Sequence, residues 1–130
     1  MNEEEIQEKL ITLTENLWFP SESDEPFAVE IKKGLTGSAI EKIAYLSSNS
    51  ENFRLLDWEL FWQPLVTPED WHGSDEEGVR LRFVELKTFF EGVTSDYFVA
   101  KSGKIEVDVW IVGTWEQTDT LILKTLSIES

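Results

Sequence analysis

The last third of the chain constrains the fold most, because three strand-like segments follow one another there with very short connections. They are residues 97–101, 104–113 and 120–128. Their apolar residues recur at every second position, and Ser102-Gly103 between the first two is typical of a hairpin turn. Consecutive strands with short connections pair antiparallel. The sequence therefore predicts an antiparallel sheet, in which one face of the middle strand takes Ile105, Val107, Val109 and Ile111.

The final strand-like segment is apolar on both of its faces. Leu121 and Leu123 lie on one face, whereas Ile122, Leu126 and Ile128 lie on the other. Strands buried on both sides need a covering layer on each. We therefore expect an α+β fold whose helices cover one face of the sheet or both, and periodicity alone does not distinguish two layers from three.

Two segments have the period of an amphipathic helix, with apolar residues spaced four, three and four apart. The first covers residues 3–17 and begins with a capping box formed by Asn2 and Glu5. The second begins at Ser74, where Glu77 completes a similar box. The buried positions that this spacing predicts are Ile6, Leu10, Leu13 and Leu17 in the first helix and Val79, Phe83, Leu86 and Phe90 in the second.

The remaining segments give shorter elements. Residues 27–33 alternate like a half-buried strand, and residues 53–56 fit a short buried strand. A helical turn or two, capped by Asp57, should end at Pro64. Residues 38–46 fit either a helix or a strand, so the structure of the region around them stays open.

Composition and charge limit the class of function. The chain of 130 residues is expected to form a single domain, residues 1–130, and 41% hydrophobic residues with six tryptophans are enough for a folded core. A formal charge of -15 repels nucleic-acid phosphates and anionic lipid surfaces. We therefore expect no direct binding of nucleic acid or membranes, and a basic protein partner fits better. The simpler interpretation is that this charge only keeps the protein soluble.

The sequence lacks the residues that several kinds of catalytic and metal sites require. There is no cysteine, and His72 is the only histidine, so no metal site or catalytic relay of the usual kind can be built around it. No cofactor-binding motif is present, and carboxylate pairs such as Glu106 and Asp108 fit a solvated or lysine-paired strand face. We expect no enzyme activity, no cofactor and no metal of its own. The acidic start lacks the pattern of a secretory signal, which favours a cytoplasmic protein.

Two prolines, Pro20 and Pro26, bracket an acidic segment, SESDEPF, that begins at Ser21. Proline disfavours a helix here and pre-orders the backbone. The segment therefore predicts a loop that presents Ser21, Glu22 and Asp24 to a partner. Taken alone, the same residues are explained equally well as ordinary turn residues.

A second candidate loop, with the sequence TPEDWHGSDEEGV, contains Asp70 and Trp71. The flanks of Trp71 are polar, so we expect it to be more exposed than Trp58 or Trp62. An exposed tryptophan beside charged residues is the usual composition of an interface anchor, although Asp70 also fits the start of a helical turn. At the other end of the sequence, Glu129 and Ser130 would add carboxylate and hydroxyl oxygens.

These two loops, together with residues 104–113 and 127–130, resemble the nuclease A inhibitor family. The resemblance implies an α/β/α sandwich with a mainly antiparallel central sheet. It also implies a protein that blocks the active site of a sugar-non-specific nuclease. The resemblance is weakest between residues 32 and 52.

The resemblance also implies roles for single residues. The family's loop glutamate, matched by Glu22, reaches the metal centre of the bound nuclease. A threonine at the family's C-terminus approaches the same metal, and Ser130 in its place keeps the hydroxyl and loses a methyl group. Asp70 and Trp71 match an interface pair. Oxygen ligands suit this role, because Mg²⁺ is usually held by one or two carboxylates, waters and phosphate oxygens.

The leading hypothesis is therefore a protein inhibitor of a sugar-non-specific, Mg²⁺-dependent endonuclease that acts through the acidic loop and the C-terminus. We expect the free protein to be a monomer. One alternative is a protein-interaction domain that keeps the inhibitor fold without nuclease binding. Another is a hydrolase based on two carboxylates, which would need both acids in one concave pocket.

Overall fold

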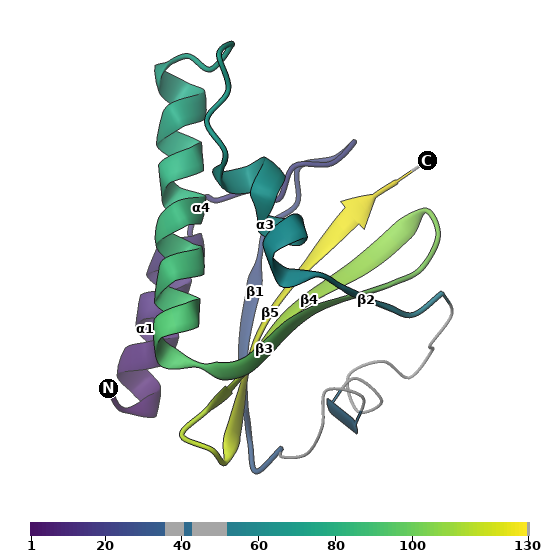
Figure 1. The fold of residues 1–130 in the computed structure, drawn as a ribbon. Coiled ribbons are helices and arrows are strands. Elements are labelled where there is room, and N and C mark those ends of the chain that lie inside the picture. Colours follow the sequence, from purple (N-terminus) through teal and green to yellow (C-terminus); the bar gives the residue numbers. More distant parts are fainter. Residues whose placement is uncertain (36–40, 43–51, 130) are drawn as a thin grey trace.

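The computed structural model describes residues 1–35, 41–42 and 52–129. A five-stranded sheet in the order β1-β5-β4-β3-β2 forms the centre of the fold, and every neighbouring pair of strands is antiparallel (Figure 1). The three C-terminal strands are β3 (Ser95–Ser102), β4 (Glu106–Trp115) and β5 (Asp119–Ile128). The predicted antiparallel sheet and the α+β class are confirmed.

The outer strands come from the first half of the chain. β1 (Ala28–Lys33) pairs with β5 as the predicted alternation allows, and β2 (Arg54–Leu56) pairs with β3 at the opposite edge. Two expectations for single residues are wrong. Leu55 is 48% exposed because β2 is an edge strand, and Ile105 is 62% exposed because it lies before β4, in the hairpin turn.

Three helices cover one face of the sheet: α1 (Glu3–Thr14), α3 (Trp58–Val66) and α4 (Ser74–Val93) (Figure 1). The capping box predicted for α1 is present, with Glu5 N donating to Asn2 Oδ1 over 2.8 Å. The helix is shorter than predicted, since Asn16 adopts a positive φ of 55°. Leu17 is buried nevertheless and adds to the core beyond the helix end.

The helix α3 begins as predicted, with Leu60 N donating to the capping Asp57 Oδ1 over 2.9 Å. The prediction that Pro64 ends it is wrong, because α3 continues to Val66. Proline removes one N–H donor from a helix. The last turn is held by another hydrogen bond, from Thr67 N to Gln63 O over 3.1 Å.

The start of α4 differs from the expected capping box by one residue. The N-cap is Gly73, whose N–H donates to Glu76 Oε2 over 3.0 Å, so the predicted pairing of Ser74 with Glu77 is wrong. The side chain of Glu77 instead contacts His72 and Arg80. Of the four apolar positions predicted for this helix, Phe83, Leu86 and Phe90 are buried, whereas Val79 is 47% exposed.

Both faces of the central strands are apolar, as the sequence predicts. The main core lies between the sheet and the helices and includes Trp62 and Phe83. A smaller cluster on the opposite face contains Ala100, Trp110, Val112 and Ile122. The expected α/β/α sandwich stays a prediction, because a layer on this second face depends on a region that includes residues outside the described ranges.

One lysine on the second face is buried. Lys42, in the short described piece between the gaps, is 3% exposed, and its ammonium group donates to Thr114 Oγ1 on β4. Burial lowers the pKa of this lysine. No helix within the described ranges is both long and apolar enough to cross a membrane.

Candidate functional site

The acidic loop is a closed structure with a buried base. Phe19 and Glu25 form an antiparallel bridge, in which Phe19 N donates to Glu25 O over 2.8 Å and Glu25 N donates to Phe19 O over 3.3 Å. The ring of Phe19 is buried and stacks on Phe61 at 5.8 Å between centroids. Glu22 and Asp24 are exposed between the two ends of the bridge. The loop therefore presents carboxylates from a base that is part of the core.

The acidic loop also packs against the end of β5. Ile128 N donates to Ser21 Oγ over 3.1 Å, and Glu22 N donates to Ile128 O over 3.4 Å. A third hydrogen bond runs from Thr125 Oγ1 to Pro26 O over 2.9 Å. The acidic loop and the C-terminal end of β5 thus lie at the same end of the molecule (Figure 1).

Glu129 follows β5 and is held by groups of this chain. Its Oε2 accepts hydrogen bonds from Lys101 Nζ and from Ser127 Oγ, each over 3.0 Å, and Arg54 lies 3.8 Å from Oε1. Burial raises the pKa of Glu129, but these hydrogen bonds and the charges of Lys101 and Arg54 outweigh it, so the net pKa is lowered. The structure thus places Glu129 beside Ile128 and the acidic loop, while Ser130 lies outside the described residues.

The second candidate loop connects α3 to α4 and exposes both of its predicted residues. Asp70 is exposed, and Trp71 is 72% exposed. The indole of Trp71 meets the ring of His72 almost at a right angle, with 4.4 Å between centroids. Trp62, by contrast, is fully buried, so the predicted contrast between these tryptophans is confirmed.

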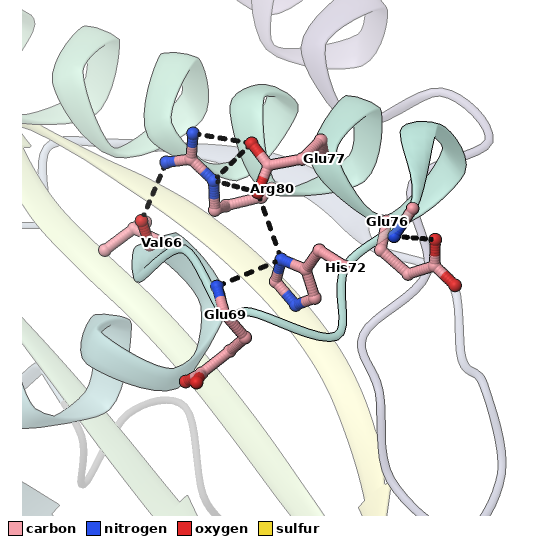
Figure 2. Close-up of polar contacts among 7 residues, drawn as sticks. Val66, Glu69, His72, Glu76, Glu77 and Arg80 are labelled. Atoms are coloured by element: carbon pink, nitrogen blue, oxygen red, sulfur yellow. Dashed lines mark hydrogen bonds and ion pairs between the residues drawn. The ribbon is translucent and has the colours of Figure 1, made fainter.

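His72 connects this loop to α4 (Figure 2). Its Nδ1 lies 3.4 Å from Glu69 N and 3.1 Å from Glu77 Oε1. Nδ1 accepts from the Glu69 amide in one protonation state of the ring and donates to Glu77 in another. The guanidinium of Arg80 continues the network, with bonds to Glu77 Oε2 over 2.9 Å and to Val66 O over 3.0 Å. The single histidine therefore has a structural role in fixing the loop.

The network also changes the acid–base properties of its members. Hydrogen bonds from Arg80 and then from His72 lower the pKa of Glu77. The hydrogen bond that Arg80 donates to Glu77 in turn raises the pKa of Arg80. Both side chains are therefore charged at neutral pH, and each neutralises the other locally.

Two open grooves lie on either side of Pro20. The Trp71 groove has a volume of about 460 Å³, and its apolar wall consists of Pro20, Pro64, Leu65, Val79 and Trp71. A second groove, of about 420 Å³, shares Pro20, Pro64 and Leu65 and continues to Leu60 and Lys101. Sequence reasoning assigned Val79 to the core and did not single out Pro20 or Leu60 as surface contacts. The helical period of the sequence does not predict that Leu60 is 67% exposed.

The structure thus brings most of the candidate residues to one end of the molecule. Ser21 and Glu22 lie beside Ile128, next to Glu129. The Trp71 loop connects to this group through Pro20, which lines the Trp71 groove and directly precedes Ser21.

Comparison with known proteins identifies a matching family. A family model described as nuclease A inhibitor-like protein matches residues 4–130. The match includes the acidic loop, the Trp71 loop and the C-terminal end, so it does not depend on one short motif. No curated protein matches the chain.

Proposed function

The chain belongs to the nuclease A inhibitor-like family, and on this basis we propose that it inhibits a sugar-non-specific, Mg²⁺-dependent endonuclease by blocking the active site. One observation carries the proposal: the exposed loop with Glu22 is hydrogen-bonded to the end of the C-terminal strand through Ile128. One target site can therefore meet both segments at once. Ser21, Asp24 and Glu129 add polar contacts around them.

The proposed mechanism is occupation of the place where a phosphate group binds. The carboxylate of Glu22 and the hydroxyl of Ser130 approach the nuclease Mg²⁺, which prefers oxygen ligands and retains several waters. Neither group contains a bond that the nuclease can cleave. Trp71 and Asp70 contact the flank of the target, and the charge of -15 accelerates encounter with a basic substrate groove.

Other properties of the proposal follow from the same residues. The inhibitor acts in the cytoplasm as a monomer, needs no cofactor, catalyses no reaction itself and binds no nucleic acid. Glu22 lies on a projecting loop, which does not favour the two-carboxylate hydrolase.

The test is titration of the purified protein into Mg²⁺-dependent digests of DNA and of RNA by a panel of sugar-non-specific endonucleases. We expect saturable inhibition of at least one of them. Glu22→Gln should raise the inhibition constant about tenfold, which corresponds to ~1.4 kcal/mol for one lost charge-assisted contact.

Glu4→Gln is the matched control, since it removes the same charge from an exposed position of α1. It should leave the inhibition constant nearly unchanged. Equal effects of the two substitutions would remove Glu22 from the mechanism. Absence of inhibition across the panel at micromolar concentration would contradict the proposed function and leave the interaction domain as the better interpretation.

A further inference from the structure

The Trp71 groove has apolar walls that are open to solvent. Trp71 and Val79 expose 72% and 47% of their surface, respectively. Pro20, Pro64 and Leu65 complete the wall from the acidic loop and from α3. Apolar surface of this kind, rimmed by polar groups, is typical of an interaction site.

The rim of the Trp71 groove is acidic. Asp75 and Glu76 line it from the first turn of α4, and the exposed Asp70 precedes Trp71. One oxygen of Glu76 caps the helix by accepting from Gly73 N. Carboxylates at this end of a helix are stabilised by the helix dipole.

Two basic side chains line the groove, His72 and Arg80, and both bond to Glu77 rather than to these carboxylates. Arg80 donates from Nε and from one terminal nitrogen to Glu77, and its other terminal nitrogen donates to Val66 O over 3.0 Å (Figure 2). Its charge is therefore balanced by Glu77. The acidic rim keeps a net negative charge from Asp75, Glu76 and Asp70.

From this combination we infer that the Trp71 groove binds an arginine side chain projecting from the partner protein. The aliphatic stem of arginine matches the apolar wall, and its guanidinium stacks on an indole while donating to carboxylates. A phosphate or an acidic side chain would be repelled by the rim. A purely apolar side chain would desolvate the rim carboxylates without compensation.

The position of the groove supports this occupant. Pro20 belongs to its wall and is followed directly by Ser21 and Glu22, so a protein that contacts Glu22 also covers the groove. The identity of that protein as a nuclease rests on the proposed function. A nuclease that binds a polyanion exposes basic side chains around its substrate groove.

The first experiment tests the groove without any nuclease. The free protein is titrated with N-acetyl-arginine amide while the indole N–H signal of Trp71 is followed by NMR, with Trp71→Phe used to assign the signal. N-acetyl-citrulline amide, which is uncharged and similar in shape, is the reference ligand. We expect saturable shifts at Trp71 with a dissociation constant on the order of 10 mM, and binding of citrulline at least about fivefold weaker.

Asp75→Asn should reduce the affinity for the arginine amide several-fold, by at least about threefold. Glu85→Gln is the matched control, because it removes the same charge from an exposed site further along α4. Shifts at Trp71 that are equal for arginine and citrulline, or unchanged by Asp75→Asn, would overturn the inference. This result does not depend on nuclease inhibition.

The second experiment tests the groove in the complex. Asp75→Asn should raise the inhibition constant about tenfold against the nuclease that wild type inhibits, whereas Glu85→Gln should change it less than about twofold. Inhibition by wild type that is insensitive to Asp75→Asn would contradict the groove's role and leave the proposed function intact. If wild type inhibits no nuclease, the proposed function fails, while the arginine amide titration still decides whether the groove recognises arginine.

Discussion

Gly113 and Gly92 are close to the same end of α4 but meet very different surroundings. A Cβ atom at Gly113 would lie 2.6 Å from the side chain of Thr94 and 2.9 Å from the ring of Phe90. A Cβ atom at Gly92 would have no heavy atom within 4 Å outside its own helix backbone. The first glycine therefore permits α4 to approach β4, whereas the second has no such packing reason.

We predict opposite effects of alanine at these two positions. Gly113→Ala should lower the free energy of unfolding by about 2 kcal/mol, because neither the buried side chain of Thr94 nor the buried ring of Phe90 can move away freely. Gly92→Ala should raise it by about 0.5 kcal/mol, because alanine is the better helix former. Urea denaturation followed by tryptophan fluorescence measures both changes. Equal stability of the two variants would contradict the packing of α4 on β4 described above.

At the residue scale, burial could be predicted where a side chain lies over the sheet and not where its element extends beyond it. Leu17 is buried although its helix ends earlier, because its position along the chain still brings it to the core. Val79 has the correct helical spacing but is 47% exposed; it belongs to the first turns of α4 (Ser74–Val93), and the start of this helix projects past the sheet (Figure 1). How far a helix extends past its sheet depends on the tertiary structure, and the periodicity of the sequence does not predict it.

Between elements, one of the hydrogen bonds that join the acidic loop to β5 is made by a side chain of the loop. Ser21 Oγ accepts hydrogen bonds from Ile128 N over 3.1 Å and from Ser23 N over 3.2 Å. Ser23 Oγ, in contrast, donates to Glu25 within the loop. Both serines thus contribute to the internal order of the loop, and Ser21 also bonds to β5.

We predict that Ser21→Ala weakens the docking of the acidic loop on β5, whereas Ser23→Ala does not. Loss of a hydrogen bond worth about 1 kcal/mol should accelerate amide hydrogen exchange at Ile128 about fivefold. Exchange at Ile128 in Ser23→Ala should remain close to that of wild type. Unchanged exchange in Ser21→Ala would show that the hydroxyl does not hold the loop.

The network around His72 gives a pH-dependent prediction for the connection between α3 and α4. The pKa of Glu77 is lowered in the folded state, by hydrogen bonds from Arg80 and then from His72. The resulting stabilisation is complete above the unfolded-state pKa of glutamate, about 4.3, and is lost as the pH falls through the folded pKa. Glu77→Gln should therefore be less stable than wild type at pH 7, with a difference that shrinks below about pH 4.3.

Thermal unfolding at several pH values, followed by circular dichroism, measures this difference. Glu76→Gln is not a suitable control, because Glu76 caps the helix, but Glu85→Gln on the exposed part of α4 is. A stability difference between Glu77→Gln and wild type that stays constant from pH 7 to strongly acidic pH would rule out the charge of Glu77 as its cause.

At the element scale, the sequence predicts helix caps and strands well and contacts between distant segments poorly. Asn2 and Asp57 cap their helices as predicted, because a cap is a local hydrogen bond. Gly73 replaces Ser74 as the N-cap because Glu77 is recruited by Arg80. The contact of Ser21 with Ile128 joins residues 107 positions apart, and no local pattern encodes it.

For the whole molecule, the charge of -15 predicts how association depends on salt. The association rate constant with a basic nuclease should fall about tenfold when the ionic strength rises from about 0.02 M to about 0.2 M. The dissociation rate constant should change much less, because it depends on short-range contacts. Stopped-flow tryptophan fluorescence measures both, and an association rate independent of salt would exclude electrostatic steering.

The order of the strands shows which part of the architecture could be predicted. The adjacency of β3, β4 and β5 follows from their short connections. The positions of β1 beside β5 and β2 beside β3 are set by longer connections, which leave several arrangements open. The position of the candidate site depends on these edge strands, because β1 directly follows the acidic loop and pairs with β5.

The bridge between Phe19 and Glu25 has a consequence for the diversity of such proteins. Because the loop is closed by backbone hydrogen bonds and by a buried phenyl ring, the side chains at positions 22 and 24 contribute little to the core. Under the proposed function, substitutions there change which target the loop binds while the scaffold keeps its folding energy. Selection can therefore retune this protein toward a different enzyme by exchanging a few tip residues, with the rest of the chain conserved as a common support.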